Sequence, residues 1–165
     1  GAYSPTFTVP EPYIPKQGAK VMSLAEPTKK MSKSDPNEKG FILLMDKPED
    51  IMRKFKSAVT DSDGQIRYAP GKDGINNLMT IYSAATGKSI ESIESEFDGL
   101  GYGQFKTTVG EAVVEQLRPV REKTEALLSD KAYLEQLYRE GAARASQIAS
   151  RTLAKVHKKI GFVQR

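Results

Sequence analysis

The sequence predicts a mostly α-helical fold, a helical bundle over residues 46–160 that follows a short extended segment with one strand. Two observations predict it. Apolar residues recur every three or four positions through most of the chain after residue 46, which is the spacing of a helix face packed on a core. Before that, four prolines in the first 20 residues forbid a helix and favour extended backbone. The helical region therefore begins after the first forty residues.

Two short apolar runs connect the extended segment to the helices. "AKVMSL", residues 19–24, is typical of a buried strand, and one strand cannot form a sheet by itself. We therefore expect its partner strands to lie outside this sequence. "FILLM", residues 41–45, either pairs with the first run or leads into the first helix, and the sequence leaves both interpretations open.

The first helix is predicted over about residues 47–59. Asp46 and Glu49 have the spacing of a capping box, in which each side chain accepts a hydrogen bond from a backbone N–H group at the helix start. Pro48 falls in the first turn, where its missing N–H leaves no hydrogen bond unmade. Apolar residues then recur every four positions, at Ile51, Phe55 and Val59.

Two short helices follow a turn-rich connection over residues 60–74. "DSDGQ" within this connection suggests a calcium loop but lacks the spacing and the distal glutamate, so we predict a turn. The second helix has apolar residues from position 75 to 85 and ends at Gly87. The third begins after Ser89, its N-cap, and ends at Asp98 and Gly99. Because both are short, packing must stabilise them.

Two long helices close the chain and show the clearest apolar repeat. Pro119 in the first predicts a kink one turn upstream, and a break at Ser129 and Asp130 separates the two helices. The apolar face of the first contains Phe105, Val109, Val113, Leu117, Val120, Thr124 and Leu127. That of the second contains Leu134, Leu137, Tyr138, Gly141, Ala145, Ile148, Thr152 and Val156.

Composition excludes several classes of protein and site. No window approaches the roughly 18 consecutive apolar residues of a membrane span, so we expect no membrane partner. The 165 residues include no cysteine, which excludes disulfide frameworks, thiolate metal sites and cysteine nucleophiles, and a reducing compartment fits this absence. The one histidine, His157, has no second metal ligand nearby in the sequence. We therefore predict no protein-bound metal.

The charge is distributed unevenly along the chain. The balance of Lys and Arg against Asp and Glu is +3 over residues 1–60, −5 over 61–130 and +6 over 131–165. A polyanionic partner is therefore expected to meet the two ends rather than the middle.

The pentapeptide "KMSKS", residues 30–34, points to a chemical role. Lysine-rich stretches are usually solvated connections, but this string would arise by chance in a chain of this length with a probability on the order of 10⁻⁴. Lys30 and Lys33 can reach different oxygens of a triphosphate, while the hydroxyl groups of Ser32 and Ser34 donate hydrogen bonds. Lysines aimed at a leaving pyrophosphate stabilise the charge that develops there when the α-phosphorus is attacked. We therefore predict an ATP-phosphate loop.

This loop and its flanks resemble a known family. "TVPEPYIPKQGAKVMSLAEPTKKMSKSDPN", "SAVTDSDG" and "GINNLMTIYSAATG" are similar to the class I aminoacyl-tRNA synthetases, and specifically to bacterial-type tryptophanyl-tRNA synthetases. The resemblance covers nearly the whole chain but only the C-terminal half of the family. It implies that residues 1–40 are the end of a Rossmann-type nucleotide-binding catalytic domain. Residues 41–165 would be a helical domain that binds tRNA at the anticodon.

The resemblance also implies site residues. The family's adenine-contacting strand position matches Val21, through backbone atoms. The positions that contact the ATP phosphates match Lys30, Met31, Ser32, Lys33 and Ser34, and Lys30 and Lys33 are the catalytic candidates. The family's other signature needs two histidines around a glycine, and the tryptophan pocket also lies on the family's first half. Because neither is present here, we expect the chain alone to be inactive.

Two functions of different classes remain open. The first is part of a cytoplasmic, homodimeric ligase that activates tryptophan with ATP, with Mg²⁺ carried by the nucleotide, and transfers it to tRNA(Trp). The second is a helical tRNA-binding module without chemistry of its own. The absent histidine pair is the sequence feature that separates them.

A basic stripe on the last helix is the candidate tRNA contact. At about 100° per residue, four basic residues fall within roughly 60° of one another beside the apolar face. They are Arg144, Arg151, Lys155 and Lys158. Such a stripe is most often only solvated, and the alternative is contact with a phosphate backbone.

Overall fold

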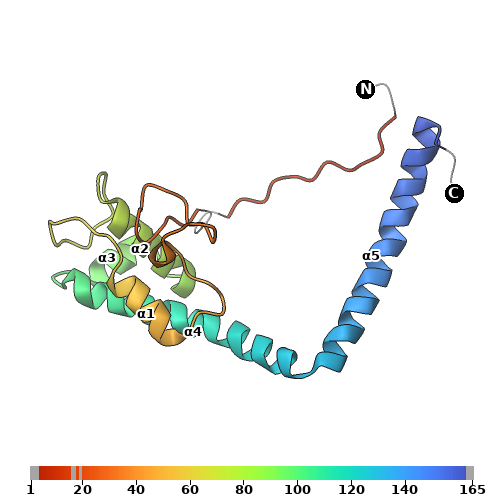
Figure 1. The fold of residues 1–165 in the computed structure, drawn as a ribbon. Helices are drawn as coiled ribbons and strands as arrows, with labels where there is room; N and C mark the ends of the chain where they lie inside the picture. The colour runs from red at the N-terminus through yellow and green to blue at the C-terminus, as the bar shows by residue number, and fades with distance from the viewer. Residues whose placement is uncertain (1–3, 16–17, 19, 163–165) are drawn as a thin grey trace. The chain divides into compact units, whose positions relative to one another are not determined.

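Helices make up most of the regular structure in the computed structural model, which describes residues 4–15, 18 and 20–162. Their order is η1 (Glu38–Gly40, a short 3₁₀ helix), α1 (Pro48–Lys56), α2 (Asp73–Thr86), α3 (Ile90–Glu96), α4 (Tyr102–Ser129) and α5 (Lys131–Ile160) (Figure 1). The mostly α-helical fold predicted from the sequence is confirmed. The helices divide between two packing units, one over Ile14–Glu122 and one that joins the chain up to Tyr13 with the chain from Lys123.

The expected strand at 19–24 is not a regular strand in the part of the chain that the structure describes, which does not include Ala19. Met22 instead forms an isolated antiparallel bridge with Lys30, so the segment pairs with the chain itself. The second apolar run leads into α1: Phe41 is buried, whereas Leu43 and the two residues after it are exposed.

The capping box predicted at Asp46 is wrong. The N-cap of α1 is Lys47, which makes no side-chain cap bond, and Pro48 occupies the first turn as predicted. The Asp46 carboxylate instead accepts hydrogen bonds from the Leu43 N–H, at 3.0 Å, and from the Lys54 ammonium group, at 2.6 Å. Because Lys54 is nearly buried, its charge needs that carboxylate. The helix ends at Lys56, so Val59 lies beyond it.

Several other helix ends agree with their predicted signals, but α3 ends at Glu96, before the stop predicted at Asp98 and Gly99. Gly87 ends α2 with φ of 76°, a left-handed conformation in which a side chain would be strained. Ser89 caps α3 by accepting a hydrogen bond from the Ser92 N–H, and Asp130 caps α5 by accepting one from the Tyr133 N–H. Pro119 lies inside α4, which is assigned as one continuous helix. The predicted kink stays a prediction.

The core of the Ile14–Glu122 unit forms around α2. Tyr82 of α2, Phe97 at the end of α3 and Phe105 of α4 meet edge to face, with ring centroids 4.8–6.4 Å apart. Gly74, at the start of α2, touches the backbone of Val59, since a Cβ at this position would lie 2.1 Å from the Val59 carbonyl oxygen. The connection after α1 therefore packs directly on the first turn of α2.

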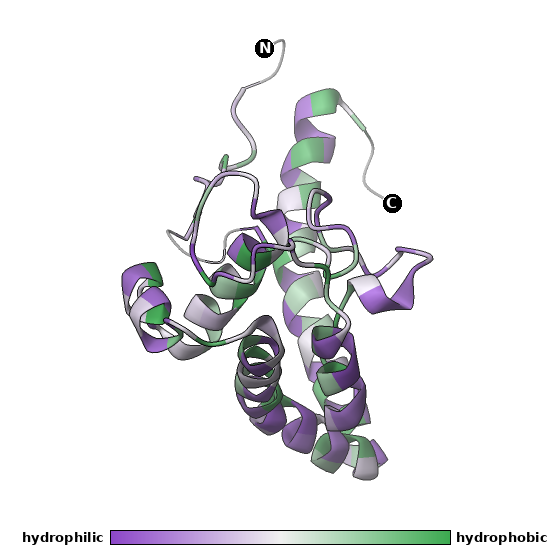
Figure 2. Ribbon diagram, turned by 90° about the vertical axis from the view of Figure 1, so that its left-hand side faces the viewer, coloured by the Kyte–Doolittle hydropathy of each residue, from purple (hydrophilic) through white to green (hydrophobic). Residues whose placement is uncertain are grey.

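The second unit is built on α5 and has no buried residue in that helix. Figure 2 shows hydrophobic and hydrophilic residues alternating around the turns of the helices. The Lys159 ammonium group donates hydrogen bonds to the carbonyl oxygens of Ser4 and Pro5 and to the Thr6 hydroxyl, at 3.2, 2.5 and 2.8 Å. Among the described residues, no helix combines the length and the apolar character needed to cross a bilayer. The expected domain boundary at residues 40 and 41 stays a prediction.

Candidate functional site

The KMSKS motif begins on the second arm of a short hairpin, with Lys30 and Met31, and continues into a turn at residues 33–34. The Ser23 N–H donates to the Lys29 carbonyl at 2.8 Å, and the Met31 N–H donates to the Val21 carbonyl at 3.0 Å. Between the arms, the Ser23 hydroxyl accepts hydrogen bonds from the N–H groups of the next turn, at 3.2 and 3.3 Å. The hairpin therefore brings Val21, the expected adenine position, opposite Met31, the second residue of the motif.

The first arm, residues 21–24, is fixed to the core. Leu24 is buried, and its backbone N–H and carbonyl bond to Gly40 at 3.0 Å and to Val59 at 2.8 Å. Asn77 of α2 holds the Met22 peptide by both polar groups: its amide oxygen accepts from the Met22 N–H at 2.9 Å, and its amide nitrogen donates to the Met22 carbonyl at 2.8 Å. The arm that faces the motif is thus attached to three segments outside the hairpin.

The second arm is more open. Met31 is partly buried against the core, whereas Lys30, Ser32, Lys33 and Ser34 are exposed. The two serine hydroxyls lie 2.9 Å apart, and the Ser32 hydroxyl also accepts a hydrogen bond from the Ser34 N–H at 3.3 Å. Met31 therefore fixes one position of the motif, while the four polar side chains of the motif face solvent.

Lysines on this arm differ in their electrostatic surroundings. Lys29, just before the motif, forms an ion pair with Glu26 at 2.5 Å, and its hydrogen bond to that carboxylate raises the pKa of Lys29. Lys30 and Lys33 form no ion pair with any residue in the described part of the chain. Their positive charges are therefore available to an external anion.

The arrangement suits a polyphosphate chemically. Two unpaired ammonium groups and two hydroxyl groups on one exposed turn supply charge and hydrogen-bond donors to anionic oxygens. No group of three or more His, Cys, Asp and Glu side chains among the described residues could hold a metal ion. The predicted roles of Val21 and of the motif residues stay predictions, and the geometry places them together.

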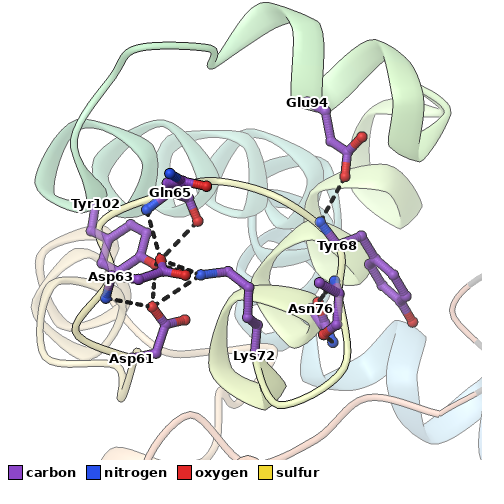
Figure 3. Close-up of polar contacts among 9 residues, drawn as sticks. Asp61, Asp63, Gln65, Tyr68, Lys72, Asn76, Glu94 and Tyr102 are labelled. Carbon is purple, nitrogen blue, oxygen red and sulfur yellow. Dashed lines mark hydrogen bonds and ion pairs between the residues drawn. The ribbon is translucent and has the colours of Figure 1, made fainter.

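A polar cluster outside this hairpin ties the connection of residues 60–72 to α4 (Figure 3). The nearly buried Lys72 ammonium group donates to Asp61 at 3.0 Å and also to Asp63. The Tyr102 hydroxyl lies within hydrogen-bond distance of both carboxylates and of the Gln65 carbonyl oxygen. The predicted turn at "DSDGQ" is therefore a turn whose two carboxylates neutralise a lysine.

The pKa values in this cluster shift together. The hydrogen bond from Lys72 holds the pKa of Asp63 well below its usual range. Burial raises the pKa of Asp61, but hydrogen bonds from Tyr102 and Lys72 outweigh burial and lower it. Burial and the hydrogen bond to Asp61 raise the pKa of Tyr102 to about 12. All three groups therefore hold their usual charge states more firmly in the folded protein.

The basic stripe lies on α5, in the other packing unit. All four predicted residues, Arg144, Arg151, Lys155 and Lys158, are exposed. Lys155 and Lys158 line one hollow of about 420 Å³ together with Ala154 and Phe162. The stripe is accessible along its whole length, and its contact with tRNA stays a prediction.

Sequence reasoning missed Asn77. This residue is only 5% exposed, yet it lies off the apolar face predicted for α2, where a polar residue is expected to be solvated. The neighbouring Asn76 was missed for the same reason. It holds the Ala69 peptide through two hydrogen bonds of 3.1 and 2.8 Å. Only the side-chain pairing seen in the structure identifies these two residues.

A family model described as tRNA synthetases class I (W and Y) matches residues 2–118 of the chain. A tryptophan–tRNA ligase from Clostridium tetani is 53% identical over 161 residues, which are 98% of this chain and 48% of that protein. The chain thus spans about half the length of the curated relatives it matches. These findings confirm the resemblance described from the KMSKS motif and its flanks.

Two solved structures resemble this fold. The tryptophanyl-tRNA synthetase from Mycoplasma pneumoniae has a TM-score of 0.77 and 30% identity, covering 88% of this chain and 46% of that one. The enzyme from Campylobacter jejuni, solved as a complex with ADP and tryptophan, has a TM-score of 0.68 and 26% identity, covering 95% of this chain and 48% of that one. The helical fold is therefore that of about half of a synthetase chain.

Proposed function

The chain belongs to the class I tRNA synthetases of the tryptophan and tyrosine group, and on this premise we propose that it is part of a tryptophan–tRNA ligase. In the proposal the intact enzyme activates tryptophan with ATP to the aminoacyl-adenylate and transfers it to tRNA(Trp). This chain supplies the ATP-phosphate loop and the helical tRNA-binding region. The intact enzyme is proposed to be a cytoplasmic homodimer.

One observation carries the proposal: Lys30 is exposed on a hairpin arm, and Lys33 in the turn that directly follows it, while the other arm is fixed to the core. Electrostatic catalysis of phosphoryl chemistry needs positive charges held in place before the reaction, because reorganising them during the reaction would cost free energy. The fixed arm supplies the position, and the unpaired ammonium groups supply the charge.

The lysines are proposed to act without exchanging protons. When the tryptophan carboxylate attacks the α-phosphorus, the bond from that phosphorus to the bridging oxygen breaks, and negative charge accumulates on the leaving pyrophosphate. Two ammonium groups beside it stabilise the transition state more than bound ATP. Mg²⁺ arrives with the nucleotide, and no residue of this chain is assigned to it.

A second candidate function is a tRNA-binding module without chemistry. The exposed basic stripe of α5, from Arg144 to Lys158, favours it, since the stripe needs nothing from the phosphate loop in order to bind a phosphate backbone. This function coexists with the first in the intact enzyme and replaces it if the chain works alone.

The test is tryptophan-dependent exchange of pyrophosphate into ATP by the intact protein and by this chain separately. We expect exchange with the intact protein and none with the chain alone. Exchange that depends on tyrosine instead of tryptophan would overturn the proposed substrate. An intact protein that binds tRNA without any exchange would favour the non-catalytic module.

Lys33→Ala in the intact enzyme tests the role of the loop. Removing a positive charge that acts mainly in the transition state should lower kcat for exchange by roughly 10²-fold and raise the KM for ATP much less. Lys29→Ala is the matched control, because Lys29 is exposed and adjacent to the motif but paired with Glu26. Equal losses for both variants, or a loss confined to KM, would contradict a transition-state role.

A further inference from the structure

We propose that Asn77 is the positioning residue that sets the placement of the KMSKS loop. The inference rests on the proposed function, since a loop needs exact placement only if its lysines act on a bound nucleotide. It assigns Asn77 no contact with ATP. Its role is exerted through Met22 and the hairpin.

The Asn77 carboxamide substitutes for a neighbouring strand. A peptide at a sheet edge presents one N–H donor and one carbonyl acceptor, which need partners when they are withdrawn from water. The Asn77 amide supplies one acceptor and one donor to Met22, at 2.9 and 2.8 Å, as an adjacent strand would. Asn77 is only 5% exposed, so most of its surface is withdrawn from water.

The held peptide lies at the point where the hairpin arms join. Met22 is bridged to Lys30, the first residue of the motif. The residues on either side of Met22, Val21 and Ser23, make the two backbone hydrogen bonds to the motif-bearing arm. A shift of the Met22 peptide therefore moves both of those bonds, and with them the backbone from which Lys30 and Lys33 project.

Asn76 provides an internal comparison. It is adjacent on the same helix and holds one peptide by the same pair of hydrogen bonds, but that peptide belongs to Ala69 in the connection of residues 60–72. Ala69 bonds to no residue of the hairpin among the interactions of the described chain. Loss of Asn76 should therefore cost stability without displacing the loop.

The experiment uses the intact enzyme with Asn77→Ala, Asn77→Asp and Asn76→Ala. We expect Asn77→Ala to lower kcat for pyrophosphate exchange at least about 10-fold more than Asn76→Ala, with the KM for tryptophan unchanged. Asn77→Asp keeps the acceptor for the Met22 N–H but sets a carboxylate against the Met22 carbonyl, so it should not rescue activity. Equal losses for Asn77→Ala and Asn76→Ala would overturn the inference.

A double-mutant cycle distinguishes a role of Asn77 in positioning the loop from a general loss of stability. If Asn77 acts through the loop, Asn77→Ala should cost much less when Lys30 and Lys33 have both already been replaced by alanine, because the lysines it positions are absent. A purely structural role would leave the two losses multiplicative. Multiplicative losses would therefore overturn the inference.

Amide hydrogen exchange provides a readout that does not depend on activity. In the intact protein, Asn77→Ala should speed exchange of the Met22 and Met31 amides about 10-fold relative to Asn76→Ala, because each missing hydrogen bond loosens the hairpin. Unchanged exchange at these amides would overturn the inference. A wild-type protein without pyrophosphate-exchange activity would instead overturn the proposed function, while the amide measurement would still decide whether Asn77 holds the loop.

Discussion

Helices α2 and α5 carry the same kind of apolar repeat in the sequence but differ in burial. In α2, eight residues are buried, among them Ile75 and Met79, which have no exposed surface. In α5, about twice as long, no residue is buried, and Ile148 is 68% exposed. The repeat therefore predicts the helix and the side that is apolar. Burial depends on neighbours, which α2 has within its own packing unit.

This difference in burial suits the two helices to different functions. The helices around α2 hold a hairpin arm and a partly buried charge cluster in fixed positions, which suits chemistry on a small substrate. Helix α5 presents exposed positive charge over many turns, which suits binding to an extended polyanion. Substitutions should accordingly act on stability in the first region and on binding in the second.

The largest expected effect comes from the aromatic core. Phe105→Ala should lower the free energy of unfolding by about 3–5 kcal/mol, because it removes a fully buried ring and leaves a cavity beside Tyr82 and Phe97. Ile148→Ala on α5 is the matched control and should cost less than about 0.5 kcal/mol. Chemical denaturation followed by circular dichroism measures both. A cost at Ile148 equal to that at Phe105 would show that α5 is buried in solution.

An intermediate effect is expected at the charge cluster. Lys72→Met leaves Asp61 and Asp63 facing each other without their cation, and the free energy of unfolding should fall by about 1–3 kcal/mol at pH 7. Lys131→Met, on α5, is the control and should change it by less than about 0.5 kcal/mol.

The pH dependence of this effect follows from the carboxyl pKa values. Both aspartates have a lower pKa in the folded protein, so their contribution to stability is present above the ordinary carboxyl pKa of about 4. It disappears as the pH falls through the lowered values, because protonated carboxyl groups no longer pair with Lys72. The difference in the free energy of unfolding between wild type and Lys72→Met should therefore shrink as the pH falls from 4 to 2. A difference that stays constant over this range would contradict the role of the ion pairs.

Local signals in the sequence predicted much of the fold. Gly87 and Ser89 predicted helix ends because their effects depend only on adjacent backbone. Asp46 predicted a cap that does not form, since Lys54, eight residues away, competes for the same carboxylate and its burial makes that pairing stronger. A capping signal therefore fails when a buried charge within reach needs the capping side chain.

In the candidate site too, features that depend on adjacent residues could be predicted, and features that depend on tertiary packing could not. The KMSKS motif is contiguous, so its residues and their chemistry could be predicted from five letters. Asn77 acts 55 residues away from Met22, and a polar residue off the apolar face of a helix carries no sign that it will be buried. The turn at Asp61 and Asp63 was predicted, whereas its pairing with Lys72 and Tyr102 depends on tertiary packing.

Substitutions in the basic stripe should have the smallest effect on stability. Their expected effect is on tRNA binding. Arg151→Glu should change the free energy of unfolding by less than about 0.5 kcal/mol, because Arg151 is exposed on a helix without buried residues. In the intact protein it should weaken tRNA binding and reduce the slope of log affinity against log salt. The reduction should be roughly 0.7–0.9 for each phosphate group that the variant no longer neutralises.

Lys131→Glu is the matched control for that variant. It changes the net charge equally but lies about 160° around α5 from Arg151 at 100° per residue. If the stripe follows a phosphate backbone, only Arg151→Glu should flatten the salt dependence, because a general charge effect acts on both variants alike. Equal slopes for the two variants would show that α5 attracts tRNA through its net charge rather than through this stripe.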